Sequence, residues 1–159
     1  MTQNVAGRPN SRPRLVQDWP SQLRLADRVV VRHGFDLAAV PHPIAVVYLV
    51  GQLEFEVASG GVLQWLTNSS GREAPATAAA LREIGAAACA EIVDQIIATL
   101  VPAPDFRDDA DRSRAVRLES VGAQSAWREL ADDLLDWPDD VDILLRRFVG
   151  ANAEAFVEG

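Results

Sequence analysis

The sequence predicts an all-α protein, folded as a compact single-domain bundle of about seven helices. Apolar residues recur at the 3.6-residue period of a helix through most of the chain. Proline and glycine stand where these periodic segments begin and end, as is typical of helix starts and caps. A chain of 159 residues, 48% hydrophobic and 24% charged, has the length and composition of one folded domain with one core.

The N-terminal segment differs from the rest of the chain. It lacks apolar periodicity, and Pro9 and Pro13 exclude a regular helix there. We therefore expect a disordered basic tail over residues 1–18 and a helical domain over residues 19–159. Trp19 lies at the boundary, where it either packs back onto the domain or provides a contact at an interface.

Two helices are predicted in the first part of the domain. An amphipathic pattern that begins at Pro20 predicts a helix ending at Gly34. The apolar run over residues 44–50 is compatible with a buried strand or a buried helix. Pro43 is a helix-start signal, and the apolar pattern continues to Val57, so that a central helix is favoured.

A break and a further helix follow. Glycines at 60–61 interrupt the pattern, a short apolar piece covers 62–66, and residues 68–71 have turn chemistry. The alanine-rich segment 75–84 predicts a helix, because Gly85 after it suits a left-handed C-terminal cap.

The C-terminal part contains three more predicted helices. Residues 89–100 carry an apolar stripe at the helical period, and Pro102 ends it. Prolines and aspartates over 102–112 indicate an exposed loop. A helix is expected between Ser125 and Trp137, and Pro138 opens the last one.

Charge is distributed unevenly along the chain. The formal net charge is −8. Residues 1–72 hold seven arginines against five acids, whereas the remainder holds eight arginines against eighteen acids. The field of the acidic half repels phosphate backbones, so we expect no direct binding of nucleic acid.

Other composition features exclude several classes of protein and site. No stretch reaches about eighteen uninterrupted apolar residues and the N-terminus has no apolar signal core, so we expect a cytoplasmic protein with no membrane partner. Cys89 is the single cysteine and lies on an apolar stripe, which predicts a buried core residue and excludes an intramolecular disulfide. His33 and His42 have no metal-motif spacing and are expected at the surface or in caps. No metal and no cofactor is expected.

The segment 54–71, EFEVASGGVLQWLTNSSG, resembles the signature of a bacterial helical family, the DNA-mimic protein domain family of the DMP-nineteen type. The resemblance covers roughly residues 24–158. It implies a helical fold and, from the studied member, an acidic dimer that imitates DNA toward a DNA-binding regulator. The chain departs from the signature at residues 58–59, where two asparagines are usual, and at Val62 and Leu66, which replace aromatic residues.

Acidic residues near the C-terminus provide the first candidate site. A helix over 125–137 places its acids on one face and its apolar residues on the other. Acids one turn apart lie roughly 5–6 Å apart, whereas phosphates follow one another at about 3.4 Å per strand along DNA, and the adjoining pair at 132–133 fills in the stripe. The same stripe is also what the solvated face of any amphipathic helix looks like. We interpret it as a face that binds a basic protein, with DNA mimicry toward a DNA-binding regulator as the specific form. This acidic face consists of Glu129, Asp132, Asp133, Asp136, Asp139, Asp140 and Asp142.

The glycine and asparagine-serine elements provide a second candidate site. They either satisfy turns or line a small polar pocket. If they line a pocket, the protein is a small-ligand binder or an enzyme centred on Gln64, Asn68 and Ser70. These residues have no evident catalytic base or oxyanion partner in the sequence. We therefore predict that the protein is not an enzyme. A third reading is a structural homodimer. The signature turn consists of Gly60, Gly61, Gln64, Asn68, Ser69, Ser70 and Gly71.

Overall fold

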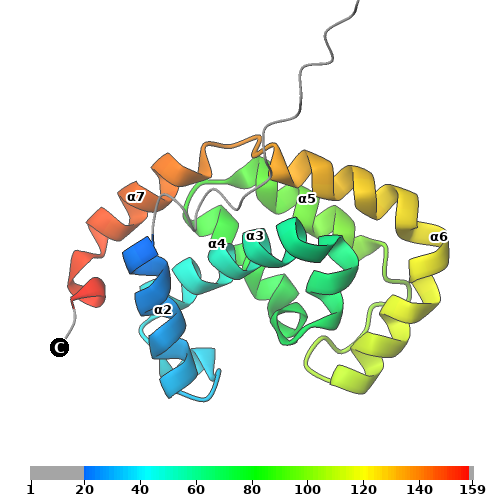
Figure 1. Cartoon of the computed structure of the whole chain (residues 1–159), viewed down its shortest axis with the longest axis horizontal. Helices are drawn as coiled ribbons and strands as arrows, with labels where there is room; N and C mark the ends of the chain where they lie inside the picture. The colour runs from blue at the N-terminus through cyan, green and yellow to red at the C-terminus, as the bar shows by residue number, and fades with distance from the viewer. Residues whose placement is uncertain (1–19, 158–159) are drawn as a thin grey trace, which may run out of the picture.

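The computed structural model describes residues 20–157 and confirms the all-α fold class. This part contains six α-helices, three short 3-10 helices and no strand. Helix α3 lies at the centre and packs against α2, α4 and α6, while α7 extends away at one end (Figure 1). The predicted tail over residues 1–18 and Trp19 lie outside the described residues.

Helix α2 (Pro20–Arg32) packs across α3 through the buried Ala26 and Val30. The two helices approach closely, because a Cβ at Gly51 of α3 would lie 2.6 Å from the Leu23 side chain. After α2 the chain turns at Gly34, where the helix was predicted to end and where φ is 63°. The 3-10 helix η1 (Leu37–Ala39) follows and is capped by Asp36.

Helix α3 (His42–Thr67) confirms the helical interpretation of the ambiguous apolar run. Gly61 interrupts it with φ 75° and ψ −171°, a conformation essentially restricted to glycine. The predicted break is therefore present, but the piece after it continues as helix. By length and composition α3 is the one helix within residues 20–157 that could cross a membrane. However, 56% of its most apolar stretch is buried inside the domain.

Three elements connect α3 to the second half of the chain. The predicted turn is the 3-10 helix η2 (Ser69–Glu73), and α4 (Ala74–Glu83) follows at once. Gly85 has φ 92°, which confirms the left-handed cap. Helix α5 (Ala87–Ala98) packs against α4 and carries the predicted apolar stripe into the core.

Helix α6 (Asp109–Leu135) is much longer than predicted. The expected loop over residues 102–112 is wrong in its last part, because the helix already begins at Asp109. The side chain of Asp108 caps it by accepting from the amides of Ala110 and Asp111. The first half was missed because residues 117–126 include no buried side chain and so have weak periodicity. Figure 1 shows that α6 bends around one end of the molecule.

Helix α7 (Val141–Ala151) begins three residues later than Pro138, where it was predicted to open. The intervening turn contains Trp137 with φ 47°. Consequently Asp140 is the N-cap and Asp139 precedes the helix, so that Asp142 alone lies in the first turn. A last 3-10 helix, η3 (Ala153–Phe156), ends the described chain.

The core contains the aromatic residues that periodicity assigns to it. Trp65, Trp127 and Trp137 are all buried, as is Cys89. The indole Nε1 of Trp127 donates to Thr99 Oγ1 at 2.8 Å, which satisfies its polar atom. The predicted burial of Cys89 is confirmed.

Candidate functional site

The signature turn is organised around a buried carboxylate, Glu56, which lies on α3 one residue before the apolar Val57. Its side chain is 8% exposed. Glu56 Oε2 accepts a hydrogen bond of 2.8 Å from Gln64 Nε2 and another of 2.8 Å from Asn68 Nδ2. Ser70 Oγ lies 3.5 Å from the second oxygen, Oε1. The Glu56 carboxylate therefore links the part of α3 before Gly61 to residues 64–70, which follow it, by hydrogen bonds.

The glycines of the signature turn allow close approaches of the chain. A Cβ at Gly60 would lie 2.7 Å from the Cβ of Gln64, so only glycine lets that side chain reach Glu56. A Cβ at Gly71 would lie 2.5 Å from the carbonyl oxygen of Leu66. Together with the kink at Gly61, these contacts give all three glycines a structural role.

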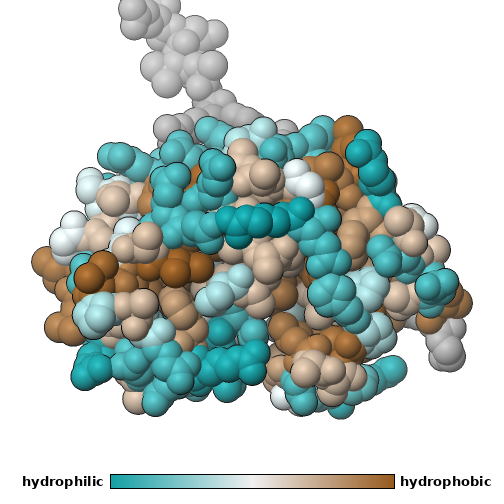
Figure 2. All heavy atoms as spheres, turned by 180° about the vertical axis from the view of Figure 1, so that it is seen from behind, coloured by the Kyte–Doolittle hydropathy of each residue, from teal (hydrophilic) through white to brown (hydrophobic). Residues whose placement is uncertain are grey.

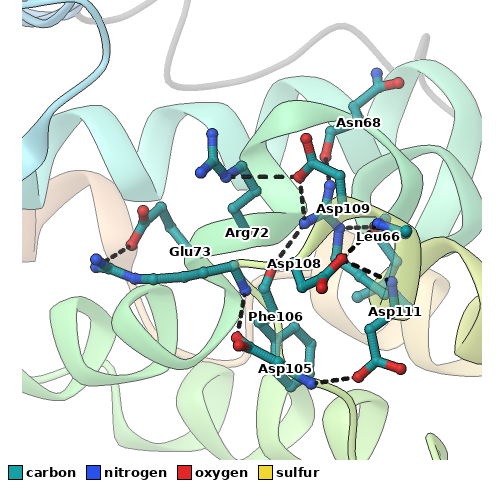
Figure 3. Close-up of polar contacts among 12 residues, drawn as sticks. Leu66, Asn68, Arg72, Glu73, Asp105, Phe106, Asp108, Asp109 and Asp111 are labelled. Carbon is teal, nitrogen blue, oxygen red and sulfur yellow. Dashed lines mark hydrogen bonds and ion pairs between the residues drawn. The ribbon is translucent and has the colours of Figure 1, made fainter.

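A buried arginine, which the sequence analysis did not identify, contacts the signature turn from α6. Arg112 of α6 is 2% exposed, and its Nε donates to the carbonyl oxygen of Leu66 at 3.0 Å. Its Nη1 donates to the Phe106 carbonyl oxygen at 2.5 Å and pairs with Asp109 at 2.9 Å. Figure 3 shows these groups converging beside Asn68. A cation at the carboxyl end of α3 satisfies free carbonyl groups and complements the helix dipole.

A pocket of about 280 Å³ lies next to the signature turn. Of the three residues in the ligand-binding hypothesis, Ser70 lines it, whereas Gln64 and Asn68 are engaged with Glu56. Ser69 also lines the pocket. The polar groups that the pocket gathers are thus largely different from those the sequence suggested.

Four members of the acidic face lie on the last two turns and the C-cap of α6, and we call them the α6 carboxylates. All four are exposed. Within residues 20–157, none of them makes a hydrogen bond or ion pair to another side chain. Figure 2 shows hydrophilic residues in a band along the upper part of the face opposite to that of Figure 1. The α6 carboxylates are Glu129, Asp132, Asp133 and Asp136.

The other three members of the acidic face have partners. Asp139 Oδ2 accepts a hydrogen bond of 2.9 Å from the amide of Cys89 at the start of α5. Asp140 caps α7 by accepting from the Ile143 amide at 3.3 Å. Asp142 pairs with Arg146 one turn later at 3.1 Å. The predicted stripe of seven therefore divides into four carboxylates open to solvent and three that stabilise helix ends.

The remaining candidates have the surroundings expected of structural residues. Burial raises the pKa of Cys89 to about 12, which keeps the thiol protonated. Both histidines are exposed, and His42 Nε2 lies 2.8 Å from Glu83. No group of three metal-ligating side chains occurs in the part of the chain that the structure describes.

Comparison with known proteins gives one match. The model of a family described as DMP19-like protein matches residues 38–152, from η1 to the end of α7. This range includes the signature turn, Arg112 and the α6 carboxylates. No curated protein and no solved structure matches the chain.

Proposed function

The chain belongs to the DMP19-like protein family, and on this premise we propose that it is a non-enzymatic interaction module whose acidic surface binds a basic protein. The α6 carboxylates carry this proposal, because they are exposed and have no partner among residues 20–157. The net charge of −8 adds a long-range attraction for a basic partner.

The position of these acids makes them more than an ordinary solvated face. They lie at the C-terminal end of α6, where the negative end of the helix dipole disfavours acidic side chains. The last turn of α6 contains no basic residue that would compensate them. By contrast, Asp109 and Asp111 lie in the first turn, where acids stabilise the helix. Helix stability therefore does not explain the α6 carboxylates, which supports a role in binding.

We propose further that the partner is a DNA-binding protein and that the α6 carboxylates take the place of phosphates. At about 1.5 Å rise per residue, Glu129 and Asp132 are separated along the axis by about 4.5 Å, and Asp132 and Asp136 by about 6 Å. Phosphates of one DNA strand follow one another at about 3.4 Å along its axis. With Asp133 between them, the carboxylates form a row of comparable charge density.

The test compares two double variants of equal net charge. Asp132→Asn with Asp133→Asn removes half of the α6 carboxylates, and Glu91→Gln with Glu154→Gln removes two exposed acids from other elements. A DNA-binding partner is first captured on the wild-type protein and identified by mass spectrometry. Displacement of its labelled DNA is then followed by fluorescence anisotropy over a salt series from about 0.05 to 0.3 M.

We expect the wild-type protein and the Glu91/Glu154 variant to displace the DNA, with an effect that weakens steeply as salt rises. The Asp132/Asp133 variant should displace it at least roughly tenfold less well while remaining folded by circular dichroism. A partner that keeps its DNA contradicts the mimicry. If the two variants displace the DNA equally poorly, binding depends on the total charge of the protein and not on the α6 carboxylates.

A second copy of the chain is the second partner that we propose. Leu118 and Val121 project from the middle of α6 with exposed fractions of 73% and 87%. They lie one turn apart, so they form a small apolar patch on a helix that would otherwise be polar there. Analytical ultracentrifugation of the wild type should give a dimer, and Leu118→Ser with Val121→Ser should give a monomer. A wild-type monomer at high concentration rejects this interface.

A further inference from the structure

The pocket beside the signature turn has features of a ligand site that do not depend on the acidic face. Five segments line it: residues 34–38 between α2 and α3, helix α3, η2, Thr77 of α4, and Arg107 in the segment before α6. Its volume of about 280 Å³ is at the lower end of the range for small-molecule sites. The space therefore fits a molecule of amino-acid size.

Several neutral polar groups line the pocket without a protein partner. The Tyr48 hydroxyl, the Gln52 amide and the Ser69 hydroxyl make no hydrogen bond to another residue within 20–157. No fully buried side-chain nitrogen or oxygen in that range lacks a partner. The polar groups of the half-buried Tyr48 and Gln52 are therefore open to water or a ligand, and Ser69, which also lines the pocket, is exposed. Burial, with the charges of Asp27, Glu56 and Glu73, raises the pKa of Tyr48 to about 12, so its hydroxyl remains a donor.

Charged groups of both signs also line the pocket. Arg72 and Glu73 are neighbours in η2, and they point in different directions (Figure 3). Arg72 pairs with Asp109 only at 3.6 Å, and Glu73 pairs with Arg107 at 3.5 Å. Both pairs are long and include an exposed arginine, so they contribute little and are readily exchanged for a ligand.

The balance of charges selects the class of ligand. The lining contains two arginines and two carboxylates, Asp36 and Glu73. Asp36 is used as the cap of η1, which leaves Glu73 as the acceptor for a cation. A ligand with a single charge would replace the partner of only one of the two η2 side chains. A ligand that carries both an anionic and a cationic group satisfies both.

We propose that this pocket binds a small zwitterion of amino-acid size, with Arg72 holding its carboxylate and Glu73 its ammonium group. A guanidinium suits a carboxylate because it offers two parallel donors. Tyr48 and Gln52 provide the neutral hydrogen bonds at the floor on α3. Apolar lining residues, including Leu37 and Leu49, accommodate the remaining carbon atoms of the ligand.

The test measures binding to the full chain by isothermal titration calorimetry and by thermal shift. Each of the twenty common L-amino acids is titrated singly, and propylamine and propionate serve as ligands that carry only one of the two charges. At least one amino acid should give a saturable heat and raise Tm, and the single-charge ligands should bind at least tenfold more weakly. Failure of all twenty, or equal binding of propylamine or propionate, overturns the proposal.

Variants locate the site. Arg72→Gln and Glu73→Gln should each weaken binding at least tenfold, as should Gln52→Ala, which breaks no side-chain hydrogen bond within residues 20–157. Glu91→Gln on α5 is the control and should bind as the wild type does. Binding that none of the three pocket variants weakens would place the ligand elsewhere and overturn the proposal. Calorimetry and thermal shift use no partner protein or DNA. Their result is therefore independent of the proposal that the acidic face binds a basic protein.

Discussion

The amide of Cys89, in the first turn of α5, donates a hydrogen bond of 2.9 Å to the carboxylate of Asp139, which lies fifty residues later in the chain. The side chain of Asp139 thus caps α5, although Asp139 itself lies in the turn between α6 and α7. It satisfies an amide that has no partner inside the helix, and its negative charge complements the positive end of the α5 dipole.

Replacement of Asp139 should therefore destabilise the fold. Asp139→Ala is expected to lower the free energy of unfolding by about 0.5–2 kcal/mol, as loss of a helix cap does. Asp139→Asn keeps an acceptor oxygen and should cost less. Urea denaturation followed by circular dichroism measures both, with Asp133→Ala as the control that removes a charge without a hydrogen bond. A loss for Asp133→Ala equal to that for Asp139→Ala would contradict the cap.

Removal of the Glu56 carboxylate should cost more. Glu56→Ala removes the charged acceptor shared by the amide donors of Gln64 and Asn68, and a hydrogen bond to a charged group contributes about 1.5–3 kcal/mol. The expected result is a drop of about that size or more in the free energy of unfolding, measured in urea. Thr67→Ala is the control, since its hydroxyl only returns to carbonyl groups of its own helix. An unchanged midpoint for Glu56→Ala would show that the carboxylate does not hold the turn.

Two glycine variants should change stability in opposite directions. Gly61→Ala forces a side chain into a backbone conformation that only glycine adopts readily and should cost about 1–3 kcal/mol. Gly122→Ala, within α6, meets nothing within 4 Å and should gain up to about 1 kcal/mol from the better helix propensity of alanine. Thermal denaturation of the two proteins side by side measures the contrast. Stabilisation by Gly61→Ala would exclude a break in α3.

The buried thiol should make stability fall at alkaline pH. Burial raises the pKa of Cys89 from 9.0 to about 12, so between these values the unfolded chain ionises and the folded chain does not. The contribution of this thiol is fully present below pH 9 and is lost as the pH rises toward 12. Denaturation of the wild type and Cys89→Ala across this range should show a smaller alkaline loss in the variant. Identical slopes in the two proteins would contradict the burial of the thiol.

Helices that pack along their whole length were predictable, because burial imposes a regular apolar period on them. Helix α5 follows this rule, and so does the end of α6 around Trp127 and Leu134. The first half of α6 was not predictable in this way, since residues 117–126 include no buried side chain and the start of the helix contains a buried charge, Arg112. A capping signal was available in Asp108, followed by the acids of the first turn.

The buried charged residues of the candidate site were harder to predict than the neutral polar residues around them. Gln64, Asn68 and Ser70 were recognised as polar residues of one motif, but the common acceptor, Glu56, lies in an apolar helix and reads as a charge on its solvated side. Arg112 lies in the segment 102–112, which its prolines and aspartates assigned to an exposed loop. A charged residue is buried only when specific partners satisfy it, and the sequence separation of those partners follows no period: it is 8 to 14 for Glu56 and 46 for the Leu66 carbonyl and Arg112. Periodicity carries no information about such pairing.

The hydrogen bond from Arg112 to the Leu66 carbonyl spans 46 positions of sequence, so the two sides of the signature turn depend on different lengths of chain. When the chain is synthesised, α3 and its polar turn emerge first, and Glu56 can gather its donors from residues at most fourteen positions away. The carboxyl end of α3 gains its arginine only once residue 112 has been added to the chain. We therefore expect a chain truncated before Arg112 to lack the donor that satisfies the Leu66 carbonyl oxygen.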